Sequence, residues 1–236
     1  MPSAEPQSFA QLAQIVRSKA GTAKRYMLGM AGYPGAGKST TAAALVAEIN
    51  KCLEEGEEQS VAAGVKDTAQ AAIVVPMDGF HRYNAALKNL DLLPLKGVPA
   101  SFDGDAFIAL LRRIKSAGTT GDTVTCPSFD RAVEEPAPDT IAVLPQHSII
   151  VVEGNYLLLD SPPWNEIPKI LDEIWFIDCP LAEIEPRLLA RHIAGGRDQA
   201  GARAKMESTD LPNARLVDAS RRRANRIVVP PPLQTK

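Results

Sequence analysis

Short apolar runs alternate along this chain with longer segments in which apolar positions recur every three or four residues. The short runs predict buried β-strands at residues 25–31, 72–77, 148–152, 173–178 and 226–229. The longer segments predict helices, for example over residues 41–49 and 103–116. Because parallel strands need crossover connections, this alternation predicts an α/β fold, with a mostly parallel five-stranded sheet between two layers of helices.

Weaker patterns complete this outline. An amphipathic helix is expected at residues 8–19 and a helix-compatible stretch at residues 200–223. The polar residues 54–70 predict an exposed connection after a helix that ends near Leu53, and the proline-containing residues 128–145 predict irregular structure. We expect one domain over residues 1–236: an N-terminal helix (1–21), a core (22–180), a helix and small helical lid (181–223), and a last strand with a Pro-rich tail (224–236).

Composition narrows the class of protein. Hydrophobic residues make up 45% of the chain, enough for a sizeable core, and a formal net charge of −2 gives no case for nucleic acid or an acidic membrane as partner. The three cysteines are far apart and show no metal or disulfide spacing, so we expect a reducing, cytoplasmic setting. No signal peptide, transit peptide or membrane-spanning run is visible, and the oligomeric state, including a homodimer, stays open.

The strongest motif is a phosphate-binding loop. The segment GYPGAGKST, residues 32–40, fits the pattern G-x-x-x-x-G-K-[ST] at every fixed position and lies between a predicted strand and a predicted helix. Its members, Gly32, Tyr33, Pro34, Gly35, Ala36, Gly37, Lys38, Ser39 and Thr40, would surround the phosphates of ATP. Lys38 would reach the outer phosphates, and the Ser39 hydroxyl would bind Mg²⁺. The segment predicts that this chain binds a nucleoside triphosphate.

Carboxylates follow three of the predicted strands, at the edge where ligands bind in such sheets. Asp78 is placed to orient an acceptor hydroxyl and accept its proton, with capping of an Asp-Gly turn as the alternative. Glu153 stands where a carboxylate would hold Mg²⁺ through its water shell, with a surface Glu at a loop start as the alternative. For Asp178, which precedes Pro180, we favour capping of the next helix.

Arginines near the end of the chain are candidates for charge neutralisation. Arg187 and Arg191 are four residues apart, so they share a helix face that suits a phosphoryl group in transit, or they form a solvated basic face. Gly195 and Gly196 follow, which suggests a hinged lid. The run Arg221–Arg223 is expected to be solvated.

The ordered segments GYPGAGKST, VPMDGFHRYN, CPSFDR, VVEGNYLLL, IWFIDCP and RLLARH resemble the uridine kinase, phosphoribulokinase and bacterial pantothenate kinase superfamily of P-loop kinases. Within it the chain is most similar to the branch of fructose-transport-system kinases, whose substrate is unassigned. The resemblance covers residues 25–229, and its most specific parts are DGFH, EGNYLLL and the segment DLPNARLV at residues 210–217.

The resemblance implies a P-loop NTPase-type fold and assigns roles to individual residues. It implies that Asp78 acts as base, Glu153 as the Mg²⁺-associated carboxylate, and Arg187 and Arg191 as lid residues. Substrate-pocket positions are implied for His81, Tyr83, Arg131 and Asn155. No secure role follows for Asn213 and Arg215.

The expected function is ATP- and Mg²⁺-dependent transfer of the γ-phosphate to a hydroxyl of a small metabolite: a nucleoside, a sugar or a vitamin precursor. One alternative is a regulatory nucleotide switch, which would call for a guanine-selective N-K-x-D element that the chain lacks. Another is a P-loop protein acting on nucleic acid, which would call for a basic stripe with interleaved aromatics.

Overall fold

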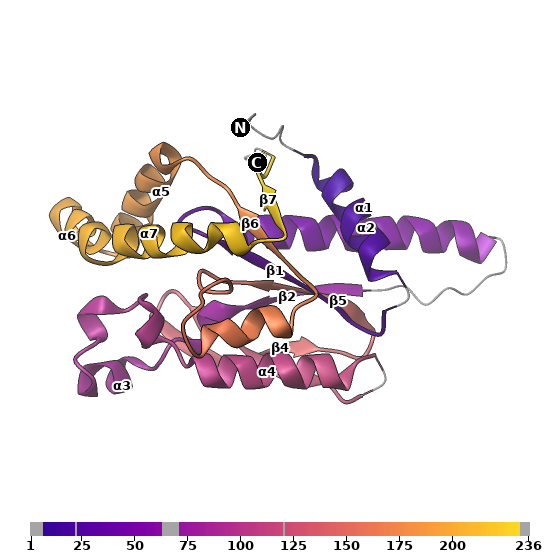
Figure 1. Ribbon diagram of the computed structural model, residues 1–236, viewed down its shortest axis with the longest axis horizontal. Helices are drawn as coiled ribbons and strands as arrows, with labels where there is room; N and C mark the ends of the chain where they lie inside the picture. Colours follow the sequence, from indigo (N-terminus) through magenta and orange to yellow (C-terminus); the bar gives the residue numbers. More distant parts are fainter. Residues whose placement is uncertain (1–6, 22, 63–70, 120, 232–236) are drawn as a thin grey trace.

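A parallel five-stranded sheet forms the centre of the molecule, in a computed structural model that describes residues 7–21, 23–62, 71–119 and 121–231 (Figure 1). Its strand order is β2–β5–β1–β6–β7. The strands are β1 (Tyr26–Gly32), β2 (Ala71–Pro76), β5 (His147–Glu153), β6 (Glu173–Ile177) and β7 (Arg226–Val228). All neighbouring strands pair in parallel, which confirms the predicted α/β class.

Two helices cover one face of this sheet, α1 (Phe9–Ala20) and α2 (Lys38–Ala62) (Figure 1). Ser8 and Gln11 form a capping box that starts α1, because each side chain accepts the backbone N–H of the other residue. The apolar face of α1 and the first turns of α2 then pack on the outward side chains of the central strands. The core on this face includes Leu12, Val16, Leu45, Ile49, Leu28, Met30, Val151 and Trp175.

The other face of the sheet is covered by α4 (Gly104–Ala117) and a 3₁₀ segment, η4 (Trp164–Lys169). The Asp103 carboxylate accepts the Ala106 N–H at 3.0 Å and starts α4. The predicted apolar face of this helix is buried as expected. It packs against side chains of the sheet in a core that includes Phe107, Leu111, Ile114, Met27, Ile150 and Phe176.

The C-terminal helices gather at the end of the sheet that carries the loop after β1 (Figure 1). They are α5 (Leu181–Ala194), α6 (Gln199–Lys205), a π-helical turn, η5 (Met206–Asp210), and α7 (Leu211–Ser220). On the opposite side of this end lie α3 (Asn84–Asn89) and three short 3₁₀ turns of the central part of the chain. The turns are η1 (Met77–Phe80), η2 (Leu93–Leu95) and η3 (Pro99–Ser101), with η6 (Arg221–Arg223) following α7.

The prediction of irregular structure at residues 128–145 was wrong. Strands β3 (Val124–Asp130) and β4 (Glu135–Val143) form a two-stranded antiparallel hairpin. Prolines are tolerated there because each strand has only one partner, so half of its backbone groups need no ladder hydrogen bond. The register shifts between Cys126 and Ser128, at Pro127.

The prediction that the helix after the phosphate loop ends near Leu53 was also wrong, because α2 continues to Ala62. The residues that extend the helix include several Glu, with Gln and Ala, and these residue types have a high helix propensity. Residues 63–70 of the expected connection, and residues 232–236 of the expected tail, lie outside the described residues.

Asp178 does not cap the next helix, as the sequence suggested, because α5 has Pro180 at its N-cap and no side-chain cap. Its carboxylate instead accepts a hydrogen bond from Arg221 at 2.6 Å. Arg223 likewise donates to the Leu158 carbonyl at 3.0 Å and pairs with Asp160, so these two arginines are not simply solvated. The chain reversal between α7 and β7 brings them to these partners, which local sequence could not indicate.

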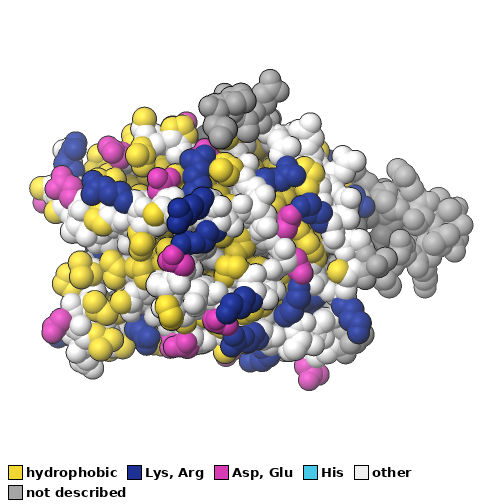
Figure 2. All heavy atoms as spheres, viewed as in Figure 1, with side chains coloured by type: hydrophobic (Ala, Val, Ile, Leu, Met, Phe, Trp, Pro, Cys, Tyr) yellow, Lys and Arg dark blue, Asp and Glu magenta, His cyan; other side chains and the backbone are white. Residues whose placement is uncertain are grey.

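On the face shown in Figure 2, Lys and Arg side chains are interspersed with Asp and Glu. Hydrophobic side chains gather at its left, where Figure 1 places α3 and the following loop. Exposed hydrophobic residues of this part of the chain are Tyr83, Leu90, Leu93 and Leu95. Among the described residues, no helix is both long and apolar enough to cross a membrane.

Candidate active site

Three strands deliver the candidate residues to one edge of the sheet. β1 ends in the phosphate loop, and its neighbour β5 ends at Glu153, which pairs in register with Met30 of β1 and with Pro76 of β2. Asp78 follows Pro76 by two residues. The carboxyl ends of parallel strands share an edge, so the loop, Glu153 and Asp78 meet at the place where α/β sheets bind ligands.

The phosphate loop has the backbone expected of an anion cradle. Gly37 has φ +83°, a conformation that favours glycine, and a Cβ added there would meet no atom within 4 Å, so the loop is open at this point. The Thr41 N–H donates to the Gly37 carbonyl at 2.8 Å and begins the α2 hydrogen-bond ladder. The N–H groups at the start of α2 are therefore available to an anion. The segment fits the phosphates of a nucleotide.

Lys38 lies inside this cradle. Its ammonium is buried and donates to the Tyr33 carbonyl at 2.8 Å. Burial lowers the pKa of Lys38 to about 8, the carboxylates of Glu153 and Asp78 act in the opposite direction, and the guanidinium groups of Arg191 and Arg131 lower it further. Lys38 is thus close enough to all four charged groups to interact with each of them.

Glu153 faces Ser39 of the loop. The Ser39 hydroxyl donates to Glu153 Oε1 at 3.0 Å, and Glu153 is only 4% exposed. Burial and then the charge of Asp78 raise the pKa of Glu153 to about 7, while Lys38 opposes them. A hydroxyl and a carboxylate suit Mg²⁺, and the described residues contain no group of three or more His, Cys, Asp or Glu side chains that could hold a metal alone. Phosphate and water oxygens would have to complete the shell.

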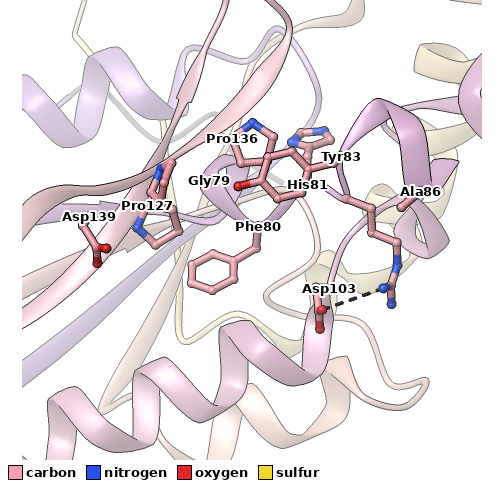
Figure 3. A pocket seen from close by; sticks show the side chains of 11 residues that line it. Gly79, Phe80, His81, Tyr83, Ala86, Asp103, Pro127, Pro136 and Asp139 are labelled. Carbon is pink, nitrogen blue, oxygen red and sulfur yellow. Dashed lines mark ion pairs between the residues drawn. The ribbon is translucent and has the colours of Figure 1, made fainter.

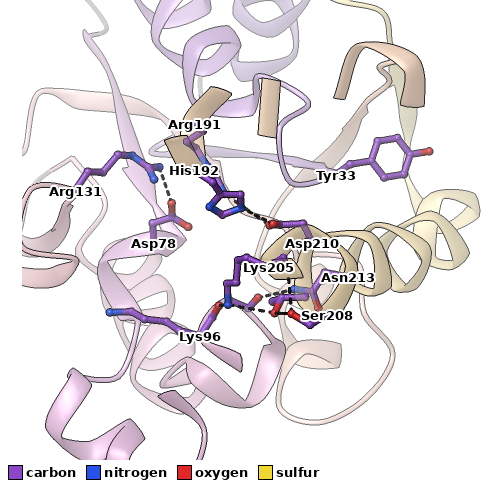
Figure 4. Close-up of polar contacts among 12 residues, drawn as sticks. Tyr33, Asp78, Lys96, Arg131, Arg191, His192, Lys205, Ser208, Asp210 and Asn213 are labelled. Carbon is purple, nitrogen blue, oxygen red and sulfur yellow. Dashed lines mark hydrogen bonds and ion pairs between the residues drawn. The ribbon is translucent and has the colours of Figure 1, made fainter. Parts of the chain in front are cut away.

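Asp78 stands opposite, in the η1 turn. Its carboxylate accepts a hydrogen bond from Arg131 of the β3–β4 connection at 3.1 Å and is 27% exposed (Figure 4). His81 Nδ1 lies 2.8 Å from the Asp78 carbonyl oxygen, and the His81 ring contacts the rings of Phe102 and Phe129 at centroid distances of 3.9 and 4.7 Å. These contacts fix the turn that carries Asp78.

Of the two predicted lid arginines, the structure brings one to this centre. Arg191 interacts with Lys38 electrostatically and lies 3.7 Å from Asp210 Oδ1 (Figure 4). Arg187 instead pairs with Glu183 at 2.6 Å and lies 3.1 Å from Cys179 Sγ. Both arginines lie on α5, four residues apart, but Arg191 forms its ion pair with a residue outside this helix, Asp210, whereas Arg187 forms its ion pair within it.

The remaining predicted positions lie further out. Tyr83 is half exposed and lines a cavity of about 330 Å³ between the η1–α3 segment and the hairpin (Figure 3). Other lining residues are Phe80, His81, Pro127, Pro136 and Pro138. Asn155 is half-buried two residues beyond the end of β5. Gly79 lines this cavity, but its neighbour Asp78 does not.

Several polar residues near this centre were not singled out by their own pattern. Asp210 is buried, and its Oδ2 atom lies 2.6 Å from Nε2 of His192. Lys96 and Lys205 are drawn below Asp78 and Asp210 in Figure 4. The DLPNARLV segment marks Asp210, but no pattern in the sequence marks Lys96 or Lys205.

A comparison with models of known protein families gave no match. Individual relatives do match. A Schizosaccharomyces pombe protein named "Putative uridine kinase" is 33% identical over 177 residues, which cover 73% of this chain and 68% of the relative. An Aspergillus versicolor protein named "ATP-dependent kinase-like protein notR'" is 35% identical over 145 residues, which cover 58% of this chain and 84% of the relative.

Among solved structures, one from Silicibacter sp. TM1040, described as a "putative fructose transport system kinase", is similar along its whole length. It superimposes with a TM-score of 0.76 at 33% identity, and the alignment covers 94% of this chain and 98% of that chain. The sheet order, the phosphate loop and these similarities lead to one conclusion. The chain belongs to the uridine kinase-like family of P-loop kinases.

Proposed function

We propose that this protein is an ATP- and Mg²⁺-dependent kinase that transfers the γ-phosphate of ATP to a hydroxyl group of a small metabolite. The observation that carries this proposal is the pairing of an open phosphate loop with a strand-end carboxylate. Asp78 and Glu153 are both close enough to Lys38 to oppose the effect of burial on its pKa. Family membership and the names of the relatives support the same activity.

In this proposal the ATP phosphates bind to residues 32–40. The glycines leave room for the phosphates, the N–H groups at the start of α2 donate to their oxygens, and Lys38 exchanges its contact with the Tyr33 carbonyl for one with an outer phosphate. Ser39 and the water shell of Glu153 would hold Mg²⁺, which neutralises phosphate charge when bound.

Asp78 would align the acceptor hydroxyl and accept its proton as the hydroxyl oxygen bonds to the γ-phosphorus and the bond to the β–γ bridging oxygen breaks. Phosphoryl transfer needs positioning and charge neutralisation more than a strong base, so a carboxylate held by Arg131 is sufficient. The hydrogen bond from Arg131 keeps Asp78 in one orientation until an acceptor replaces it.

Two further cations near the centre would stabilise the phosphoryl group in transit. Arg191 and Arg131 both interact with Lys38, and planar guanidinium groups suit charge that is spread over three oxygens. Arg187, proposed for the same role from the sequence, would first have to leave Glu183.

The acceptor would be enclosed by the η1–α3 segment and the hairpin. The cavity between them has a volume of about 330 Å³ and is lined by Tyr83, His81 and three prolines (Figure 3). Asp78 is not one of its lining residues, so an acceptor bound there would have to extend past Gly79 to reach the carboxylate. Tyr83 and His81 were proposed as substrate positions from the sequence, together with Arg131 and Asn155.

An ATP-consumption screen tests the proposal. The purified protein is incubated with Mg-ATP and panels of nucleosides, sugars, pantothenate-like alcohols and other vitamin precursors, and ADP formation is followed. We expect one class to raise turnover far above slow hydrolysis, with a phosphorylated product visible by mass spectrometry. Hydrolysis that no hydroxyl compound stimulates would favour a nucleotide-binding regulatory NTPase instead.

A further inference from the structure

Three carbonyl oxygens of the loop between α3 and α4 are held by side chains from elsewhere in the chain. Lys205 at the end of α6 donates from Nζ to the carbonyls of Pro94 at 3.0 Å and Lys96 at 2.8 Å. Asn213 of α7 donates from Nδ2 to the Gly97 carbonyl at 3.0 Å, and the Tyr156 hydroxyl donates to the same oxygen. Side chains of α6 and α7 thus hold this loop by hydrogen bonds to its backbone carbonyls.

Two of the three donors, Asn213 and Tyr156, are buried, and the third, Lys205, is partly buried. Asn213 is 4% exposed, and Lys205 completes its donors with the buried Thr209 hydroxyl at 3.1 Å. A buried amide or ammonium without its acceptor costs far more than a well-made hydrogen bond gains. Displacement of the loop from α7 would therefore leave the buried Asn213 amide without its acceptor.

A chain of contacts leads from this loop to Asp78. The Gly97 N–H donates to Ser101 Oγ at 2.8 Å, and the neighbouring Phe102 ring packs on the His81 ring. His81 Nδ1 in turn lies 2.8 Å from the Asp78 carbonyl oxygen. A displacement of the loop would therefore reach the turn that carries the proposed base.

We propose that Asn213 and Lys205 are positioning residues for the acceptor side of the centre: by holding the carbonyls of residues 94–97 against the C-terminal helices, they fix the loop that supports His81 and Asp78. This gives the DLPNARLV segment a role. Asn213 holds the loop between α3 and α4 through the Gly97 carbonyl, and Asp210 pairs with Arg191 of α5. The expected effect on catalysis rests on the proposed function. The expected effect on the position of the loop does not depend on it.

Peptide-level hydrogen exchange of the full-length protein tests the structural part without any acceptor. Asn213→Leu keeps the approximate volume and removes the donors, and Lys205→Met keeps the length and removes the charge. Each is expected to increase amide exchange in residues 93–102 about tenfold or more and to leave the phosphate-loop peptide unchanged. Arg203→Met, on the same helix and exposed, is the matched control, and Lys205→Arg should recover most of the protection.

Unchanged exchange at residues 93–102 in both variants would overturn the proposal. If Asn213→Leu does not fold, Lys205→Met decides the question alone. With an acceptor found by the screen, both variants should raise its KM about tenfold while the Kd of ADP stays within about twofold. A uniform loss of ADP binding and activity would show a general folding defect and contradict the positioning role. Failure of the screen with altered exchange would count against the kinase function only.

Discussion

Ser39 and Glu153 lie 114 positions apart in the chain, and the Ser39 hydroxyl donates to the Glu153 carboxylate at 3.0 Å. Parallel pairing of β5 with β1 brings them together at the end of the sheet. The carboxylate is almost fully buried, and its nearest cations oppose but do not cancel the cost of burial. A buried acid with a raised pKa is typical of a site built to receive a further positive charge.

Glu153→Gln should stabilise the protein without ligand at pH 8. The pKa of Glu153 is raised from its usual value to about 7 in the folded state, so the cost of ionising it is absent below about pH 4.5, grows as the pH rises, and is complete above about pH 7. The variant should gain about 1–3 kcal/mol of unfolding free energy at pH 8 and little at pH 4.5. Urea denaturation at the two pH values measures this, with the exposed Glu185→Gln as control. A variant less stable than wild type at pH 8 would contradict the assignment.

Lys38→Ala should weaken nucleotide binding. The ammonium would contact an outer phosphate, and hydrogen bonds to charged groups contribute about 1.5–3 kcal/mol, which corresponds to roughly 10- to 150-fold in Kd. Titration calorimetry with ADP and a non-hydrolysable ATP analogue measures the loss, which should be larger for the analogue. Lys88→Ala, exposed on α3, should bind like wild type. Equal affinities for wild type and Lys38→Ala would exclude the loop as the nucleotide site.

Asp78→Asn should lower kcat by about 10²- to 10⁴-fold, because the amide cannot accept the proton of the acceptor hydroxyl. The Kd of ATP should change by no more than about threefold, since the contact matters in the transition state. Steady-state kinetics on the acceptor found by the screen, with exposed Asp122→Asn beside it, makes the comparison. Near-normal turnover of the variant would show that another group takes the proton.

Arg191→Met should reduce kcat more than Arg187→Met. Arg191 interacts with Lys38, whereas Arg187 is paired with Glu183 on the same helix. We expect a loss of about 10²-fold or more for Arg191→Met and less than about tenfold for Arg187→Met. Equal losses in single-turnover phosphoryl transfer would indicate that α5 rearranges and delivers both arginines.

Gly79→Ala should destabilise the fold and the acceptor side of the site. A Cβ at this position would lie 2.3 Å from the Pro127 carbonyl oxygen, so the hairpin and the η1 turn would have to separate. Overpacking of this kind costs about 1–3 kcal/mol. Thermal and urea unfolding measure the cost, and Gly195→Ala, where the nearest atom is 3.4 Å away, is the control. An unchanged stability of Gly79→Ala would mean that the hairpin packs loosely on this turn.

The sequence predicted the elements with strong local signals. Apolar runs identified the five strands of the main sheet, and the Gly-rich segment between a strand and a helix identified the phosphate loop. Asp78 and Glu153 were identified because strand ends in a parallel sheet share one edge, a rule that needs no knowledge of the strand order. The β3–β4 hairpin was missed because its prolines are acceptable at an edge, where the pattern of a central strand does not apply.

The sequence by itself determined the α/β class, the phosphate loop and the two carboxylates, because each depends on a few neighbouring residues and on the geometry of one strand end. Only the tertiary structure decided which charged side chains surround them. Arg191 pairs with Asp210 and Arg187 with Glu183. Asp178 accepts a hydrogen bond from Arg221, and Asn213 donates to the Gly97 carbonyl across 116 positions. Such contacts follow from how helices pack on the sheet, and packing of distant segments leaves no periodic trace in the chain.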